Sequence, residues 1–377
     1  METVGRKKAD VGIITFHCAD NYGAMLQAYG LKRYLETSGV PADIVPYEPP
    51  FMTGRHWWIP YIPIGGPKKC IRWGVTRWRA HKRMGTDFFR LRANMRRFRR
   101  TYLVRRGQGR ILFAWQMKRL TYRCYIVGSD QIWNPAITCG LRPVYFGAFE
   151  NRRKEKVAAY AASLGGKALE ERYDAEFSAL LAHVDVISLR EAAAVPYIGK
   201  FRREPIQAVL DPVFLPGKDE WEKIEKPPRR EGYILLYATE LDRDMIGYAR
   251  ELSENTGLKV VELRTNTGET DKSFLVDYTA GPAEFLGYIH RADYVVTNSF
   301  HMAAFSIIYE KRFLAFLHSS FGARIHNILQ IHGLESRLCE NGRRADMNGT
   351  IDWEDVKRRR ESCAEESKRF LTDHIRV

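Results

Sequence analysis

The segment from Tyr294 to Phe316 (YVVTNSFHMAAFSIIYEKRFLAF) constrains the fold more than any other part of the chain. A β-branched strand is followed by a polar Thr-Asn-Ser turn, an apolar helix that opens on His301, and a second strand. In a parallel βαβ unit, ligands bind where the first strand turns into the helix. The helix N-terminus favours a bound anion, and a histidine there can donate or accept a proton near neutral pH. The segment therefore predicts an α/β fold with an anion site that carries an acid or a base.

The same alternation of strands and helices runs along most of the chain. A strand at 11–16, a helix after the turn Asn21-Tyr22-Gly23 and a strand at 42–47 predict a parallel sheet. A polar, proline-bearing stretch then interrupts the pattern before cleaner alternation resumes, so we expect two α/β domains with a cleft between them. The expected parts are an N-terminal domain (1–214), a linker (215–230), a second domain (231–345) and a C-terminal helix (346–377) able to pack back on the N-terminal domain.

The composition favours a cytosolic protein. The chain has 377 residues, an ordinary hydrophobic content of 45%, no apolar run that could span a bilayer and no secretory segment before its first strand. Its six cysteines are scattered without a CxxC pair, which argues for reduced thiols and against a zinc site or a disulfide framework. We therefore expect no bound metal and no cofactor.

The net charge of +15 is concentrated in one segment. Residues 51–119, the basic segment, contain 19 lysines and arginines, a single acid (Asp87) and five of the eight tryptophans. Such a segment suits single-stranded nucleic acid, the anionic surface of a cytoplasmic membrane, or a solvated cationic surface. Because no motif of a familiar nucleic-acid-binding module is present, peripheral membrane contact is the favoured interpretation.

Two turns in the first half contain candidate site residues. Asp130 and Gln131 lie in the turn VGSDQIWNP, where a carboxylate suits a base or a ligand for hydroxyl groups, and a helix cap is the alternative. Asn21 and Tyr22 lie in the first strand-to-helix turn, where a ligand could approach the backbone closely. An asparagine at such a position is more often simply a turn residue.

Arg190 is a candidate anion-binding residue. It follows the strand-like run DVISL, and an arginine at a strand end suits bidentate recognition of a carboxylate or phosphate. A structural ion pair, with Glu191 or another acid, is the alternative.

His301 is the candidate acid or base of the second half, and a hydrogen-bonded histidine capping the helix is the alternative. Asn298 and Ser299 lie in the turn before it. Arg324 lies on a predicted helix at 321–332, where it could complete an anion pocket or face solvent.

Taken together, these motifs resemble those of the polysaccharide pyruvyl transferase family. The residues that carry the resemblance are, in order, ITFHCADNYGAMLQAYGLKRYL, VGSDQIWNP, AAYAASLG, SLREAAAV, LDPVFL, YVVTNSFHMAAFSIIYEKRFLAF and ARIHNILQIHGLESRL. They touch most of the chain from Val11 to Leu338, apart from the basic segment. The resemblance implies two Rossmann-like domains facing a cleft, as in glycosyltransferases of the GT-B type.

The resemblance also implies an activity, the transfer of the pyruvyl group of phosphoenolpyruvate onto two hydroxyls of a cell-surface glycan as a cyclic ketal. By this resemblance, Arg190 matches the family's arginine after a strand and His301 matches its histidine. From the chemistry of the reaction we expect catalysis by His301 and Asp130 and donor binding by Arg190, Ser299 and Arg324. We expect contacts with the acceptor or cleft from Asn21, Tyr22, Gln131 and Asn298. Three positions depart from the family pattern: Asn298 stands for the usual aspartate, Ser299 for a frequent arginine and Met302 for the usual glycine. Either the donor's anion is held by another residue, for which Arg324 is the candidate, or the donor differs.

Two other functions suit the sequence. A nucleotide-sugar-dependent glycosyltransferase would use the same fold, with the helix of His301 facing a diphosphate. A non-enzymatic nucleic-acid-binding protein is motivated only by the charge of the basic segment. The favoured expectation is a cytoplasmic transferase at the inner face of the membrane, acting on a lipid-linked saccharide with phosphoenolpyruvate as donor and with no specific nucleic-acid partner.

Overall fold

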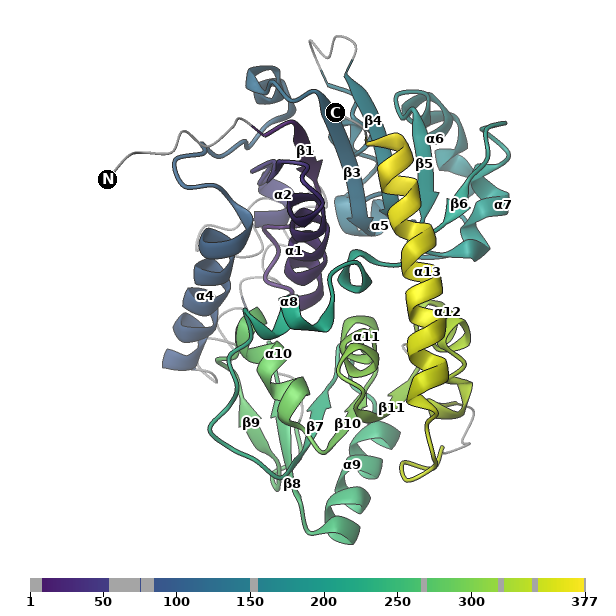
Figure 1. The fold of residues 1–377 in the computed structure, drawn as a ribbon. Coiled ribbons are helices and arrows are strands. Elements are labelled where there is room, and N and C mark those ends of the chain that lie inside the picture. Colours follow the sequence, from purple (N-terminus) through teal and green to yellow (C-terminus); the bar gives the residue numbers. More distant parts are fainter. Residues whose placement is uncertain are drawn as a thin grey trace. The chain divides into compact units, whose positions relative to one another are not determined.

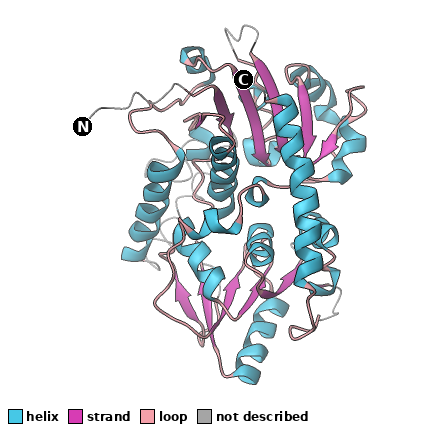
Figure 2. Cartoon of the chain, in the orientation of Figure 1, coloured by secondary structure: helices cyan, strands magenta, loops and turns pink. Residues whose placement is uncertain are grey.

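The computed structural model describes residues 9–53, 75, 85–149, 155–265, 270–317, 322–340 and 345–375. The chain forms two compact units. Unit 1 comprises 1–66, 99–216 and 363–377, and unit 2 comprises 67–98 and 217–362. Each unit is built around one parallel sheet (Figures 1 and 2).

The sheet of unit 1 has six parallel strands in the order β2-β1-β3-β4-β5-β6. The strands are β1 (Val11–Ile14), β2 (Ala42–Ile44), β3 (Cys124–Asp130), β4 (Lys156–Ala162), β5 (Val186–Leu189) and β6 (Gln207–Ala208). The central strands β1, β3 and β4 are buried almost throughout, because helices cover a parallel sheet on both faces (Figure 1). Their largely apolar composition suits that burial.

The helices of unit 1 are short apart from the first. They are α1 (Tyr22–Thr37), α2 (Pro50–Thr53), α5 (Pro135–Thr138), α6 (Asp174–Leu181) and α7 (Val195–Ile198), with a π-helical turn at Arg99–Leu103 and 3₁₀ turns at Ala114–Arg119, Pro143–Phe146, Glu171–Tyr173, Ala192–Ala194 and Pro212–Phe214. In the core, the ring of Trp133 stacks on Phe146 with centroids 5.2 Å apart, and both rings contact Phe177 edge to face. These aromatic contacts hold the turn after β3 against the sheet.

The sheet of unit 2 also has six parallel strands, in the order β12-β11-β10-β7-β8-β9. The strands are β7 (Tyr233–Tyr237), β8 (Lys259–Leu263), β9 (Leu275–Asp277), β10 (Tyr294–Thr297), β11 (Arg312–Phe316) and β12 (Leu338–Cys339). Its helices are α4 (Thr86–Phe98), α8 (Lys218–Glu222), α9 (Arg243–Thr256), α10 (Pro282–Arg291), α11 (Phe300–Ile308) and α12 (Gly322–His332), with a 3₁₀ turn at Glu335–Arg337. This strand order is that of a dinucleotide-binding Rossmann sheet.

The last helix, α13 (Trp353–His374), contributes to both units. Its residues up to Ser362 belong to unit 2, and its final turns belong to unit 1. In unit 1, the backbone N–H of Leu210 donates to Ser367 Oγ at 2.9 Å, and Phe370 contacts the ring of Tyr160. The end of the chain is therefore a component of the unit 1 core.

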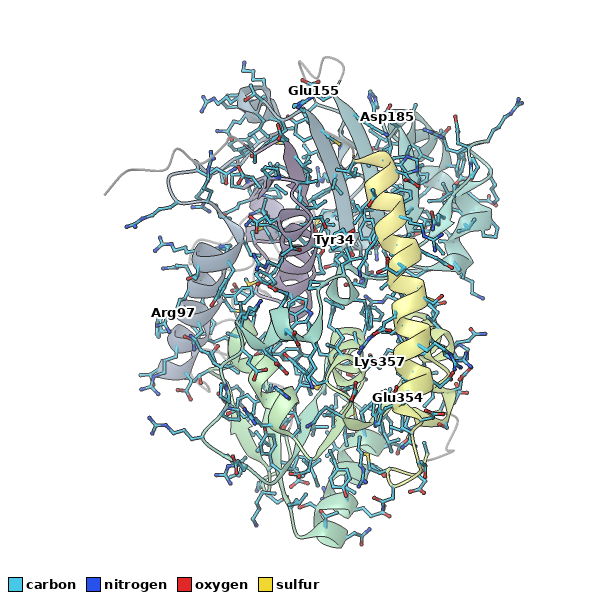
Figure 3. The ribbon with its side chains drawn as sticks, viewed as in Figure 1. Tyr34, Arg97, Glu155, Asp185, Glu354 and Lys357 are labelled. Carbon is cyan, nitrogen blue, oxygen red and sulfur yellow. The ribbon has the colours of Figure 1, made fainter. Side chains whose placement is uncertain are left out.

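The predicted fold class is confirmed, since the chain forms two Rossmann-like α/β units. The compact units differ from the predicted boundaries at α4, which comes from the basic segment but packs in unit 2. There Asn94 Nδ2 donates to Thr279 O at 2.9 Å, while Arg97 in the last turn of α4 is exposed (Figure 3). The predicted linker also contains an ordered helix, α8, whose Trp221 is buried against Phe305.

Across the described ranges, no helix is long and apolar enough to cross a membrane. Four of the tryptophans that mark the basic segment, Trp57, Trp58, Trp73 and Trp78, lie outside the described residues. Trp115 is described and belongs to unit 1.

Candidate functional site

Each sheet has one point where the strand order reverses, and ligands of open α/β sheets bind beside the carboxyl ends of the strands at such a point. In unit 1 the reversal lies between β1 and β3, and in unit 2 it lies between β7 and β10. Among the predicted residues, Asn21 and Tyr22 follow β1, Asp130 is the last residue of β3 and Gln131 comes directly after it. Asn298, Ser299 and His301 follow β10.

In unit 1, hydrogen bonds tie together the loops after β1 and β3. Thr15 Oγ1 donates to the carbonyl oxygen of Ser129 at 3.1 Å, and Gln27 Nε2 donates to Thr15 Oγ1 at 2.8 Å. Asn21 is exposed and caps α1, its side-chain oxygen accepting from the N–H of Ala24 at 2.9 Å. Asn21 therefore has a structural role as a turn and cap residue, which agrees with the alternative that the sequence left open for it.

The backbone at the carboxyl ends of β3 and β4 is strained. Asp130 has φ +71° and Ala161 has φ +48°, a region that non-glycine residues enter at a cost of about 1–3 kcal/mol. The side chain of Ser188 supports the second position, because its hydroxyl accepts from Ala161 N at 3.2 Å and donates to Ala159 O at 3.0 Å. Backbone strain of this kind is found at functional sites more often than elsewhere in proteins. In Figure 3, Glu155 and Asp185, which precede β4 and β5, lie at the amino ends of these strands, at the opposite end of the sheet.

Arg190 lies at the end of β5 inside a group of carboxylates. Its Nε donates to Glu191 Oε1 at 3.0 Å and its Nη1 donates to Asp211 Oδ2 at 3.0 Å, while Asp130 Oδ1 lies 4.0 Å from Nη1. Burial lowers the pKa of the guanidinium, but the charges of Glu191 and Asp211 raise that pKa by more than burial lowers it. Arg190 is therefore a permanent cation. The ion pair weighed as the alternative for Arg190 is thus present, with two partners.

Two hydroxyl groups also donate hydrogen bonds to these buried carboxylates. Ser163 Oγ donates to Glu191 Oε1 at 2.9 Å, and Ser129 Oγ donates to Asp211 Oδ2 at 3.3 Å. Asp130 is the most exposed carboxylate of the group, with 13% of its side-chain surface accessible. Three carboxylates share one guanidinium at the carboxyl ends of these strands. This group therefore suits ligands that donate hydrogen bonds, such as sugar hydroxyls, better than it suits a second anion.

Gln131 is held in place next to Asp130. Its N–H donates to Asp130 Oδ1 at 2.8 Å, and its side-chain Oε1 accepts from Asn134 Nδ2 at 2.8 Å. Gly165 approaches both amides so closely that a Cβ atom there would lie 2.3 Å from each. A glycine is therefore required at position 165, where φ is also +80°.

In unit 2, Asn298 joins the loops at the reversal point. Its Oδ1 accepts from the N–H of Thr239 at 2.7 Å and from Thr239 Oγ1 at 3.1 Å, while its Nδ2 donates to Glu240 O at 3.1 Å. Only an amide can both accept and donate in this way. An aspartate at this position would place a carboxylate against the carbonyl of Glu240, which gives a physical reason for the asparagine.

Helix α11 begins directly after Asn298. Ser299 is its N-cap, with Oγ accepting from the N–H of Met302, and His301 stands in the first turn with 9% of its surface exposed. The rings of Phe300 and His301 meet edge to face with centroids 5.0 Å apart, and the guanidinium carbon of Arg324 lies 5.9 Å from the centroid of Phe300. A helix N-terminus, a histidine and an arginine therefore gather at one end of α11, as an anion site with a proton donor requires.

Comparison with known proteins identifies the family of the chain. A family model described as polysaccharide pyruvyl transferase matches residues 21–320, a range that begins after β1 and includes β3, β7 and β10. The chain belongs to the polysaccharide pyruvyl transferase family. Membership supports polysaccharide pyruvylation in general terms and a transferase as the class of enzyme.

No curated protein matches this pyruvyl transferase family member. Solved structures with a similar arrangement include UDP-N-acetylglucosamine 2-epimerase from Rickettsia bellii, with 9% identity, a TM-score of 0.48 and coverage of 97% of this chain and 96% of that one. Another is the UDP co-structure of MnaA from S. aureus, with 10% identity, a TM-score of 0.48 and coverage of 97% and 95%. The E. coli heptosyltransferase WaaC is a third, with 11% identity, a TM-score of 0.38 and coverage of 93% and 99%.

The candidate residues of this family member fall into two groups. Asn21, Tyr22, Asp130, Gln131 and Arg190 belong to unit 1, and Asn298, Ser299, His301 and Arg324 belong to unit 2. Tyr22 is almost fully buried, so its side chain is part of the core at the start of α1. Within the described ranges, no group of three or more His, Cys, Asp or Glu side chains could hold a metal ion.

Sequence reasoning missed three contributors to these groups. Asp211 and Ser129 complete the surroundings of Arg190, and Thr239 anchors Asn298. The Asp-Pro pair in the sequence could have indicated a capping role for Asp211. In the structure, Asp211 is the N-cap of the turn that follows, and its side chain accepts from Val213 N at 3.1 Å. A pocket of about 590 Å³ beside Asp293 and Arg312 lies at the amino ends of β10 and β11, away from the predicted residues.

Proposed function

We propose that this protein transfers the pyruvyl group of phosphoenolpyruvate onto two hydroxyls of a sugar, forming a cyclic ketal on a lipid-linked precursor of a cell-surface glycan. The reaction takes place in the cytoplasm at the inner face of the membrane, and the basic segment contacts the anionic lipid surface. The observation that carries the proposal is the position of His301, in the first turn of α11 and beside Arg324, in a chain whose family acts on polysaccharides.

The chemistry defines what the site must provide. A proton adds to the methylene carbon of the donor, and a sugar hydroxyl attacks the neighbouring carbon, which bears the carboxylate and the phosphate. The second hydroxyl then displaces phosphate, so that two C–O bonds form and one C–O bond to phosphate breaks. Of the two hydroxyl protons, one replaces the proton taken up by carbon and the other leaves with phosphate or solvent. The site therefore needs an acid, acceptors for hydroxyl protons, and cations or N–H groups for the donor's two anionic groups.

Unit 2 is assigned the donor. The N-terminus of α11 and Arg324 bind its anionic groups, Ser299 presents the first N–H groups of the helix as N-cap, and His301 supplies the proton. Asn298 keeps the loop before α11 in place through its bonds to Thr239 and Glu240. In this assignment Arg324 replaces the arginine that the family often has at the position of Ser299.

Unit 1 is assigned the acceptor. Asp130, the most exposed carboxylate around Arg190, accepts a hydroxyl proton, and Gln131 and Asn21 lie at the same edge of the sheet. Tyr22 fixes the start of α1 from the core. Donor binding by Arg190 stays a prediction. Its contacts support a second role, as the buried counter-charge of Glu191, Asp211 and Asp130.

Calorimetric titration of phosphoenolpyruvate into the purified protein tests the donor assignment. The wild type should bind, and Arg324→Ala should weaken binding by roughly tenfold to a hundredfold, as expected when a charged hydrogen bond is lost. His301→Ala should retain most of the binding but lose about 10²–10⁴ in turnover, measured as phosphate release with a glycan acceptor. Arg358→Ala is the control, since Arg358 is an exposed arginine of α13.

The same titration separates the proposal from the glycosyltransferase alternative. Failure of the wild type to bind phosphoenolpyruvate at millimolar concentration, together with a thermal shift caused by a nucleotide sugar, would overturn it. Equal affinity in the wild type and Arg324→Ala would reject only the role of Arg324.

A further inference from the structure

One described stretch of the basic segment, continued to the start of β3, carries positive charge without any acid. Residues 99–123 contain eight lysines and arginines and no aspartate or glutamate. All of them belong to unit 1. The stretch leads from the π-helical turn at Arg99–Leu103, through the 3₁₀ turn at Ala114–Arg119, to β3.

The fold fixes this stretch beside the edge strand β2. Ile111 pairs with Tyr47 in an isolated parallel bridge, and its N–H and carbonyl bond to Pro46 O at 2.9 Å and to Glu48 N at 2.7 Å. Gln116 Oε1 accepts from the N–H groups of Leu112 and Phe113, and the side chains of Ile111 and Met117 are buried. Buried residues therefore anchor both sides of the short sequence Phe113-Ala114-Trp115.

That short sequence, the Phe113–Trp115 tip, exposes two large aromatic rings. Phe113 is 49% exposed and Trp115 is 48% exposed, although both adjoin a well-anchored turn. The ammonium of Lys118 and the guanidinium of Arg119 lie 5.8 and 5.9 Å from the centroid of the Trp115 ring. Cations thus surround an apolar tip, the composition of segments that enter the interface of an anionic bilayer.

Four of the eight cations of the stretch are available to an external partner. Arg105, Arg110 and Arg123 contact Asp43, Glu48 and Asp10, respectively. The other exposed cations of the stretch, which have no acidic partner among the described residues, are Arg100, Arg106, Lys118 and Arg119. Each Lys or Arg close to an anionic membrane strengthens binding by about fivefold at low salt.

We propose that the Phe113–Trp115 tip, with Arg100, Arg106, Lys118 and Arg119, inserts into the headgroup region of an anionic phospholipid bilayer. This rests on the proposed function in one respect, since it places the enzyme where a lipid-linked acceptor is found. A membrane fits better than single-stranded nucleic acid, because base stacking uses the face of an aromatic ring and two cations already lie at the ring of Trp115. Phe113 offers no polar group to a base, whereas a bilayer interface accommodates its ring fully.

Cosedimentation with vesicles tests the aromatic part, using the full chain and no substrate. The vesicles contain either phosphatidylcholine alone or phosphatidylcholine with about a third phosphatidylglycerol. The wild type should pellet with the anionic vesicles only, and Phe113→Ser/Trp115→Ser should lower the partition coefficient about tenfold, since two half-exposed rings lose their burial in lipid. The control pair replaces Phe89, an exposed ring of α4, and Leu241, exposed in unit 2, by serine.

A matched charge swap tests the electrostatic part. Arg106→Ser/Lys118→Ser/Arg119→Ser should weaken binding to anionic vesicles by roughly a hundredfold at low salt, and by less at physiological salt. Arg172→Ser/Lys200→Ser/Arg203→Ser removes the same net charge from exposed positions elsewhere in unit 1 and should change binding by less than about threefold. Circular dichroism confirms that each variant is folded.

Three outcomes would overturn the proposal: equal loss in the two charge variants, unchanged binding in the aromatic variant, or oligonucleotide binding that depends on the tip more strongly than vesicle binding does. The first indicates general attraction by net charge, and the third assigns the tip to nucleic acid. None of these outcomes depends on turnover or on phosphoenolpyruvate binding, so they are independent of the donor assignment.

Discussion

Replacing Arg190 by methionine should destabilise unit 1 severely. Arg190→Met keeps most of the aliphatic stem but removes the charge that faces Glu191 and Asp211. The side chains of the three residues are only 3%, 8% and 0% exposed, so solvent cannot replace the lost partner. Breaking a buried pair from one side costs about 3–5 kcal/mol, because a charge is left uncompensated. The hydroxyls of Ser163 and Ser129 still donate to the carboxylates in the variant. We therefore expect a loss of stability at the lower end of this range, about 3 kcal/mol.

The loss should depend on pH in a definite direction. Without the guanidinium, burial raises the pKa of the two carboxyl groups in the folded variant above their values in the unfolded chain. The penalty is then fully present above the raised pKa and shrinks as pH falls through it, because protonated carboxyls are neutral in both states. The gap in unfolding free energy between wild type and variant should therefore be larger at pH 7.5 than at pH 5.

Urea unfolding at both pH values, followed by circular dichroism, measures this gap. Arg172→Met is the control, since Arg172 pairs with Glu170 on the surface with 67% and 70% of the side chains exposed, and should cost less than about 1 kcal/mol. Adding Asp211→Asn to Arg190→Met should recover part of the loss. A loss below about 1 kcal/mol for Arg190→Met, unchanged between the two pH values, would refute the reasoning.

Further predictions concern three other positions. Asn298→Asp should lower the stability of unit 2 by about 1–3 kcal/mol, because Glu240 O loses its donor and faces a carboxylate; thermal unfolding beside Asn348→Asp, at a surface position, checks this, and an equal effect would contradict it. Gly165→Ala should cost at least about 1 kcal/mol in urea unfolding, since its Cβ would collide with two amides at φ +80°; unchanged stability would mean that the loop adjusts freely. Burial lowers the pKa of His17 to about 4, while the unfolded chain binds the proton near 6.5, so stability is full above pH 6.5 and falls by roughly 2 kcal/mol on going down to pH 4.5. His17→Asn should flatten that part of the pH profile, and an identical profile would exclude His17 as the source.

The local elements were predictable because apolar periodicity and turn residues act over short distances. The strand-turn-helix-strand pattern at Tyr294–Phe316 matches β10, α11 and β11 closely. Within the basic segment, the helix α4 begins at Thr86, ends at Phe98 and continues as a π-helical turn. The strand β6 has only two residues and is exposed, and it lies at the edge of its sheet.

The pairing of side chains was not predictable. Arg190 and Asp211 are 21 residues apart, and Thr239 and Asn298 are 59 apart, so their contacts depend on which strands become neighbours and in what register. A single sequence shows that a polar residue follows a strand, but not which residue from another strand it will meet. For the same reason the membership of α4 in unit 2 could not be read from its charge.

The division of unit 1 among three stretches of chain imposes an order on its folding during synthesis. Its last stretch, 363–377, emerges after all of unit 2, and the amide of Leu210 is made 157 residues before its partner Ser367. At about 5–20 residues per second, a ribosome needs roughly 10–30 s to cover that interval. Unit 2 can therefore finish first, while the surface of unit 1 around Tyr160 stays uncovered until the final turns of α13 arrive. A nascent chain stalled before Cys363 holds one complete unit and one that lacks its closing helix, a natural target for chaperones.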